Sequence, residues 1–217
     1  GPVPLTVAGG EGSWLLTDDG RRILDGGGGA IVANIGHGRP EPAVAAAEAL
    51  TNYAYAVPPF ATEARVRLIE RLTGGWLPPG MTRCLFVSGG SESVDSALRI
   101  ARQHHVCLGE TGRTKIIGRS ISYHGATLDS LAVANHDRRR AGLEPMLADW
   151  PKADALDAEA VRKLVETEDP GTIAAIIAEP VSGASGAALV PPDDYLPALR
   201  SICDDHGILL ISDEVMT

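Results

Sequence analysis

Four short polar or glycine-containing stretches follow apolar runs in this sequence, and their side chains could do chemistry. They are Ser88–Gly89–Gly90–Ser91, Ser122–Tyr123–His124–Gly125, Glu179–Pro180 and Asp213–Glu214. If the apolar runs before them are parallel strands, all four stretches lie at the carboxyl edge of one sheet. Open α/β sheets bind their ligands outside that edge. The pattern therefore indicates a ligand site there, with a glycine turn, two carboxylates, a tyrosine and a histidine available to it.

The first stretch lies within FVSGGSESVDSALRIAR (86–102), which has the composition of a strand end, a turn and a helix start. Gly89 and Gly90 allow a ligand close to the backbone, and the free N–H groups of a helix N-terminus attract an anion such as phosphate. The Ser91 hydroxyl could add a hydrogen bond. An ordinary turn with Ser91 as the helix N-cap explains the same residues. The pattern is not G-x-G-x-x-G, and no G-K-[ST] follows it, so neither a dinucleotide site nor a P-loop is favoured.

The last stretch places Asp213 directly after the apolar run ILLIS (208–212). A carboxylate at the mouth of a buried strand could pair with a cationic ring nitrogen, and such a pair stabilises both charged forms. The alternative is that Asp213 only caps the turn after the strand.

The elements that must position these side chains can be predicted from the periodicity of apolar residues. Residues 13–25 resemble a hairpin around the turn Asp18–Asp19–Gly20. Alternating short apolar runs and amphipathic segments follow, which is typical of a mostly parallel sheet with helices on both faces, an α/β fold. The expected strands are 83–87, 115–118, 172–178 and 208–212, and the expected helices are a segment beginning near 41, then 61–72, 92–107, 126–134 and 193–206. The acidic segment 152–170 is expected to form a solvated helix and loop.

Composition excludes several classes of function. The formal net charge of −9 indicates no basic face for nucleic acid or anionic lipid, and Arg138–Arg140 are expected to form a solvated turn. No apolar run approaches the roughly 20 residues of a membrane span. Cys84, Cys107 and Cys203 are odd in number and widely spaced, which argues against a disulfide framework or a zinc site. A cytoplasmic location is the simplest expectation.

Six ordered motifs together resemble the class III aminotransferases, the ornithine or omega-aminotransferase group, along nearly the whole chain. They are the glycine- and aspartate-containing segment Gly12–Asp25, NIGHGRP (34–40), FVSGGSE (86–92), SYHGAT (122–127), AEPVSG (178–183) and SDEVMT (212–217). The resemblance implies the fold type I of pyridoxal-phosphate-dependent transferases, with pyridoxal 5'-phosphate as cofactor. It also implies that residues 1–50 are an N-terminal segment of the small domain, and that residues 51–217 are an incomplete cofactor-binding large domain.

The resemblance also implies roles for individual residues. Gly90 and Ser91 would hold the cofactor phosphate, and Tyr123 and Val215 would pack on the two faces of its pyridine ring. Asp213 would pair with the ring nitrogen, so that the ring withdraws electrons. Glu179 would support the ring hydroxyl side and orient Asp213, and Asp213 and Glu179 are therefore the predicted catalytic residues. His124 could take part in the chemistry or only shape its turn.

Four residues lie where family members line the substrate pocket, although core packing explains them equally well: Ile31, Val32, Tyr53 and Tyr55. Two departures from the family pattern bear on the substrate. Gly89 replaces the usual serine of the phosphate loop, and Ser182–Gly183–Ala184 stands where many members have Q-G-E. The second departure is similar to the amine:pyruvate type and weakens an ornithine or GABA assignment.

The lysine that holds the cofactor covalently in family members has no counterpart here. Lys115, Lys152 and Lys163 do not stand in a similar motif, because in the family this lysine comes after the D-E-V pattern, and so does the arginine that receives a substrate carboxylate. We therefore expect transamination from an amine or amino acid to a 2-oxo acid by a homodimeric complete enzyme, and an inactive isolated chain. The alternatives are a decarboxylase or aminomutase of the same fold, or a non-catalytic cofactor-binding fragment. The glycine pattern disfavours a nicotinamide-dependent dehydrogenase.

Overall fold

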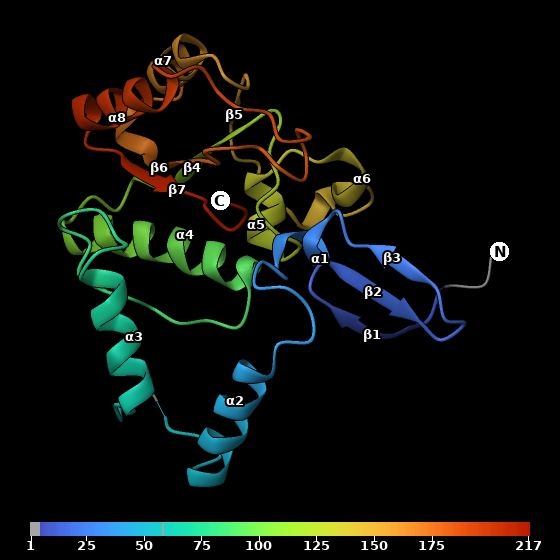
Figure 1. The fold of residues 1–217 in the computed structure, drawn as a ribbon. Helices are drawn as coiled ribbons and strands as arrows, with labels where there is room; N and C mark the ends of the chain where they lie inside the picture. Colours follow the sequence, from blue (N-terminus) through green and yellow to red (C-terminus); the bar gives the residue numbers. More distant parts are fainter. Residues whose placement is uncertain (1–4, 58) are drawn as a thin grey trace. The chain divides into compact units, whose positions relative to one another are not determined.

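The computed structural model describes residues 5–57 and 59–217. The chain divides into two compact units, Gly1–Cys84 and Leu85–Thr217, which are described separately (Figure 1). The predicted division into residues 1–50 and 51–217 includes residues outside the described ranges, and it stays a prediction.

The first unit contains a small antiparallel sheet and three helices. Strands β1 (Val7–Glu11), β2 (Trp14–Thr17) and β3 (Arg22–Leu24) pair in sequence order, which confirms the predicted hairpin and adds β1 to it. Helices α1 (Gly28–Ile31), α2 (Pro40–Asn52) and α3 (Glu63–Thr73) follow. The Thr62 hydroxyl caps α3 by accepting the Arg65 N–H, which satisfies one of the free donors at the helix start.

The second unit contains a parallel sheet in the order β5-β4-β6-β7. Its strands are β4 (Lys115–Arg119), β5 (Lys152–Ala153), β6 (Ile173–Ala178) and β7 (Leu209–Ser212), and every pairing is parallel. The helices are α4 (Gly90–Cys107), α5 (Leu128–Val133), α6 (Asp137–Arg140), α7 (Ala158–Thr167) and α8 (Tyr195–His206), with 3-10 turns at Glu144–Met146 and Pro170–Thr172. The predicted α/β class with a parallel sheet is confirmed.

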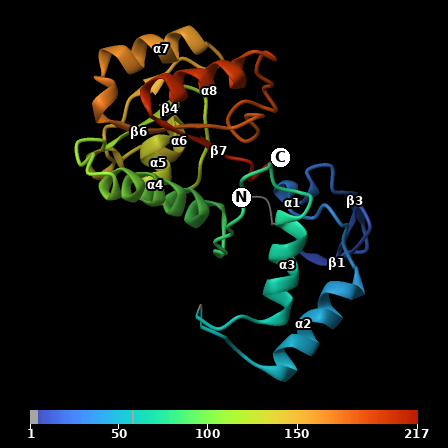
Figure 2. The ribbon, with the colours of Figure 1, turned by 90° about the vertical axis from the view of Figure 1, so that its left-hand side faces the viewer.

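Helices cover both faces of this sheet, as predicted. Alternate residues of β6 point to opposite sides, so Ile176 packs with Leu199 of α8 on one face, and Ile177 packs with Val94 and Leu98 of α4 on the other. Figures 1 and 2 show α7 and α8 on one side of the sheet and α4 on the other. The strands are apolar because both of their faces are buried.

The expected strand at 83–87 is wrong. This segment has no regular secondary structure, and Leu85, Phe86 and Val87 are exposed. A strand needs a neighbour for its backbone N–H and C=O groups, and within the part of the chain that the structure describes no strand pairs with it. Its mostly apolar composition alone therefore does not make it a strand.

A smaller difference concerns the acidic segment 152–170. The acidic region contains a short strand, β5, before helix α7, because two residues suffice to pair with the end of β4. Over residues 5–57 and 59–217, no helix combines the length and apolar character that crossing a membrane requires.

Candidate active site

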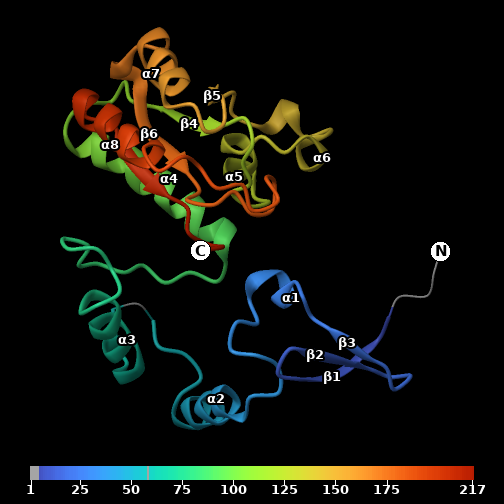
Figure 3. The same cartoon turned by 45° about the horizontal axis from the view of Figure 1, so that its top comes forward.

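The carboxyl edge of the parallel sheet brings the predicted cofactor residues around one cavity of about 200 Å³. The start of α4 and the segments after β4, β6 and β7 all contribute to it. The lining residues are Gly90, Ser91, Tyr123, His124, Gly125, Glu179, Asp213, Val215 and Met216. Figures 1 and 3 show the last residues of the chain beside the first turn of α4. All six predicted cofactor-binding residues are thus neighbours, although they come from four separate segments.

A buried pair of side chains forms the base of the cavity. His124 Nδ1 lies 2.7 Å from Asp213 Oδ2, and both side chains are almost fully buried. The other carboxylate oxygen of Asp213 accepts the N–H of Val215 at 3.1 Å, and the Asp213 N–H donates to the Ala178 carbonyl at 2.9 Å. These bonds fix the position of the carboxylate. His124 Nε2 is buried and has no partner among residues 5–57 and 59–217.

Glu179 is a second buried carboxylate on this edge. Its Oε1 accepts the backbone N–H of Tyr123 at 3.1 Å and lies 3.7 Å from Arg119 Nη2. Burial raises the pKa of Glu179 above its usual value, while the Tyr123 N–H, His124 and Arg119 oppose that rise. Glu179 therefore ties the Tyr123 segment to the end of β6.

The start of α4 has the features of an anion site. The helix begins after Gly89, which has extended backbone and no side-chain cap, so the alternative of Ser91 as N-cap is wrong. Instead, Ser91 Oγ accepts the Ala126 N–H at 3.0 Å. A Cβ on Gly125 would lie 2.6 Å from Ser91 Oγ, and a Cβ on Gly90 would lie 3.0 Å from Val215. Glycine at both positions leaves uncapped helix N–H groups next to an open space, which suits an anion.

The Tyr123 ring forms a wall of the cavity and is held by two other side chains. The Arg139 guanidinium lies 4.5 Å from the ring centroid, and the His136 ring meets it edge-on at 6.2 Å. A cation on an aromatic face is attracted by the ring's electrons. These contacts fix the wall against which a flat ligand would stack.

The arrangement fits pyridoxal phosphate on several independent points. The cavity has an aromatic wall for a pyridine ring, a fixed carboxylate for its nitrogen, and a glycine-lined helix start for its phosphate. The buried, unpartnered Nε2 of His124 shows that the polar groups here are not satisfied by the described chain alone. The cofactor roles of the six residues stay predictions, now with a geometry that suits them.

The four predicted substrate residues belong to the first unit. Ile31, Val32, Tyr53 and Tyr55 are all exposed, so core packing within that unit does not account for them. Their role toward a substrate stays a prediction.

The lysines have other partners. Lys115 Nζ pairs with Glu168 at 2.8 Å, and Lys152 Nζ donates to the Trp150 carbonyl. Lys163 is exposed on α7. None of them lines the cavity.

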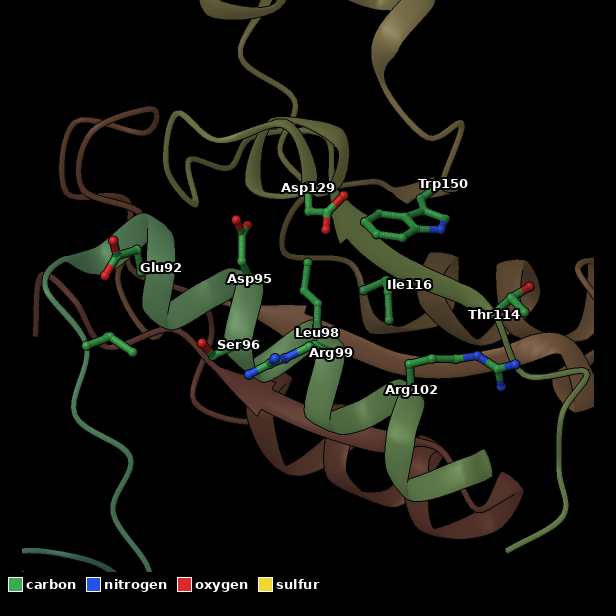
Figure 4. A pocket seen from close by; sticks show the side chains of 11 residues that line it. Glu92, Asp95, Ser96, Leu98, Arg99, Arg102, Thr114, Ile116, Asp129 and Trp150 are labelled. Atoms are coloured by element: carbon green, nitrogen blue, oxygen red, sulfur yellow. The ribbon is translucent and has the colours of Figure 1, made fainter. Parts of the chain in front are cut away.

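A larger hollow of about 690 Å³ lies along α4 and contains none of the predicted site residues (Figure 4). Most charged side chains that line it are already engaged. Asp95 accepts the Thr127 hydroxyl, Arg102 donates to two backbone carbonyls, and Glu92 accepts the Ser88 N–H. Since its charges hold the local structure together, this hollow is a weaker candidate than the smaller cavity.

One residue and one contact of the edge were not identified from the sequence. Arg119 was not singled out, and the bond between His124 and Asp213 was not foreseen. A signal for Arg119 existed, because an arginine that ends an apolar strand is rarely buried without a partner. No comparable signal existed for the histidine, since its partner is 89 residues away.

Comparison with known proteins gives consistent matches. A family model described as aminotransferase class-III matches residues 1–217. The chain is 36% identical to a beta-alanine–pyruvate aminotransferase of Pseudomonas aeruginosa, over 99% of this chain and 51% of that protein. Among solved structures, a transaminase from the marine bacterium Virgibacillus matches with a TM-score of 0.94 at 33% identity, over 99% of this chain and 50% of that one. An amine transaminase from an uncultivated Pseudomonas species, in its PLP-bound form, matches with a TM-score of 0.90 at 38% identity, over 99% of this chain and 52% of that one. The chain spans about half the length of the relatives it matches.

Proposed function

The chain belongs to the class III aminotransferase family, and from this membership we propose that the full-length protein is a pyridoxal-phosphate-dependent transaminase. It would move an amino group from an amine or amino acid to a 2-oxo acid. The observation that carries the proposal is the cavity in which the Asp213–His124 pair, the Tyr123 wall and the Gly90 helix start meet.

Pyridoxal phosphate, when bound, withdraws electrons from the substrate carbon and so makes its proton removable. The residues of this chain would bind and orient it. Asp213 would accept a hydrogen bond from the protonated ring nitrogen, and His124 would keep the Asp213 carboxylate in place. Gly90 and Ser91 would receive the phosphate at the start of α4, where the helix dipole favours negative charge.

Transamination needs an amine that removes the substrate proton, and no lysine lines this cavity. We propose that it comes from outside the 217 residues, so the isolated chain would bind the cofactor without turning it over. The same holds for a cationic group that receives a substrate carboxylate. Cytoplasmic location and assembly as a homodimer remain part of the proposal.

An omega-amine:pyruvate preference is the finer proposal. It is supported by Ser182–Gly183–Ala184, which lacks the second glutamate of the Q-G-E motif. It is also supported by the name of the beta-alanine–pyruvate relative. In the structure the Ser182 segment is held by a bridge to Leu189, so it forms a defined turn beside Glu179.

The test is a donor and acceptor screen with the full-length protein and added pyridoxal phosphate. We expect alanine to form from pyruvate with an omega-amino acid donor, faster than glutamate forms from 2-oxoglutarate. Release of carbon dioxide or migration of the amino group within the donor would instead indicate the decarboxylase or aminomutase alternative. Absence of cofactor binding would contradict the whole proposal.

A further inference from the structure

Arg119 is a buried cation at the end of β4 that the roles described above do not use. Its side chain is 1% exposed, and Nη2 donates to the Glu179 carbonyl and to Ser182 Oγ, each at 3.0 Å. Nε and Nη1 are buried with no hydrogen-bond partner within the two described ranges of the chain, and the guanidinium lies 5.9 Å from the centroid of the Tyr195 ring. Burying a charge with so few partners is costly, which suggests that the site needs this charge.

The other charged groups at the carboxyl edge of the sheet explain why the charge of Arg119 is needed. Two buried carboxylates, Glu179 and Asp213, lie near one guanidinium, Arg119, and one imidazole, His124. With His124 neutral, these groups carry a single net negative charge. One negative charge complements a protonated pyridine ring, whereas without Arg119 two carboxylates would repel each other there.

We propose that Arg119 is a positioning residue for the cofactor: it holds the Glu179 carboxylate against the Tyr123 backbone and fixes the turn from Glu179 to Ser182. The inference rests on the proposed function. Arg119 touches neither the cavity nor a ligand, so it acts through Glu179. The aromatic wall and the end of β6 then keep their places while the cofactor enters and leaves.

The same arrangement predicts a dependence on pH. Burial already raises the pKa of Glu179, and the groups that face it are Arg119, His124 and Asp213. Arg119 lowers this pKa, so its loss would raise it further. As pH falls, Glu179 would then take up a proton at a higher pH than in the unaltered protein, and its bond from the Tyr123 N–H would weaken.

Arg113 offers a matched control at the other end of β4. It is also mostly buried, and it donates to the Pro170, Ile173 and His206 carbonyls and pairs with Glu110. Its contacts are of the same kind as those of Arg119, but they lie at the amino edge of the sheet. Replacing Arg113 should therefore cost stability without changing the cavity.

The experiment compares Arg119→Met, Arg119→Lys and Arg113→Met in the full-length protein. The dissociation constant of pyridoxal phosphate is measured by equilibrium dialysis across a pH series, together with the absorbance of the bound cofactor and the melting temperature. For Arg119→Met we expect affinity to fall about 10-fold or more, since the partner carboxylate is left buried and unpaired. We also expect the acid loss of affinity to begin at higher pH. Arg119→Lys should restore part of the affinity and part of the pH dependence, because lysine keeps the charge but cannot make both hydrogen bonds of the guanidinium.

For Arg113→Met we expect a lower melting temperature and an affinity within about 2-fold of the unaltered protein. The inference is overturned if folded Arg119→Met binds the cofactor with the affinity and pH dependence of the unaltered protein. It is also overturned if Arg113→Met loses affinity to the same extent. If the unaltered protein binds no cofactor, the proposed function itself fails, and this result is distinct from the other two.

Discussion

The two ends of the parallel sheet carry similar sets of residues, but these sets differ in how many of their polar atoms have hydrogen-bond partners. At the amino edge, His105 Nδ1 lies 2.7 Å from Glu110, and Arg113 pairs with the same carboxylate. At the carboxyl edge, His124 Nδ1 lies 2.7 Å from Asp213. Both histidines are buried, and both have an arginine of β4 or its flank nearby.

The difference lies in the second nitrogen of each imidazole. His105 Nε2 lies 2.9 Å from the Ala174 carbonyl, and because a carbonyl only accepts, this nitrogen is the donor. His124 is one of the residues that line the cavity, and its buried Nε2 has no hydrogen-bond partner among the described residues. The amino-edge set is thus complete within the fold, whereas the carboxyl-edge set leaves capacity for a ligand. The geometry of a histidine–carboxylate pair alone does not distinguish a structural site from a functional one. The number of polar atoms that have a hydrogen-bond partner does distinguish them.

The strongest test of this comparison exchanges each carboxylate for its amide. Asp213→Asn in the full-length protein keeps the shape but removes the charge that would stabilise a ring cation, so we expect turnover to fall about 100-fold or more. Glu110→Gln removes the corresponding charge at the amino edge, and turnover should change by less than about 2-fold. Steady-state kinetics and melting temperatures of both variants provide the measurement. Near-normal turnover of Asp213→Asn would contradict the assigned role.

A smaller effect is expected from the two histidines. His124→Gln can still donate to Asp213 but places it less rigidly, and we expect turnover to fall about 10-fold with little loss of stability. His105→Gln cannot satisfy both Glu110 and Ala174 in the same way, and we expect the free energy of unfolding to fall by about 1–3 kcal/mol with turnover unchanged. Urea unfolding and kinetics separate the two. Equal losses of turnover in both variants would remove the distinction between the edges.

Glycine substitutions sharpen the comparison further. Gly125→Ala would place a Cβ 2.6 Å from Ser91 Oγ at a φ of 135°, so it should weaken phosphate and cofactor binding. Gly207, the C-cap of α8, also has a positive φ, of 63°, but a Cβ added there would lie 3.6 Å from its nearest neighbour, Arg113 Nη2. We expect a cost of about 1 kcal/mol in stability there, from left-handed backbone alone. Titration with pyridoxal phosphate should show weaker binding only for Gly125→Ala.

Much of this arrangement could be predicted from the sequence, for reasons visible in particular residues. Strand β6 is an uninterrupted apolar run, and Gly207 marks the end of α8, so both follow from local pattern. The segment 83–87 could not be predicted in the same way, because its structure depends on a pairing partner rather than on its composition. The carboxyl-edge residues could be placed together because parallel strands align their ends. The contact between His124 and Asp213 and the burial of Arg119 depend on side-chain packing between distant segments, which no local pattern encodes.

The smallest expected effect tests whether a perturbed ionisable group near the carboxyl edge is necessarily functional. Lys152 pairs with β4 at Gly118, and burial, assisted by Arg140, lowers its pKa to about 8. Its Nζ donates to the Trp150 carbonyl, and it does not line the cavity. The unfolded chain holds the lysine proton up to a higher pH, near the ordinary value of 10.5. Stability should therefore rise with pH between about 8 and 10.5, because the unfolded state binds more protons in that range.

Lys152→Met removes this cost of burying a charge. We expect the variant to be more stable than the unaltered protein at pH 7, by about 1 kcal/mol, and the gain to shrink as pH approaches 10. Lys163→Met on the exposed face of α7 is the control and should show no such trend. Cofactor affinity should be unchanged in both variants, measured beside urea unfolding at several pH values. Loss of cofactor affinity in Lys152→Met would show that the functional region extends past the cavity to the edge strand β5. Lys152 would then belong with the carboxyl-edge residues that have hydrogen-bonding capacity for a ligand.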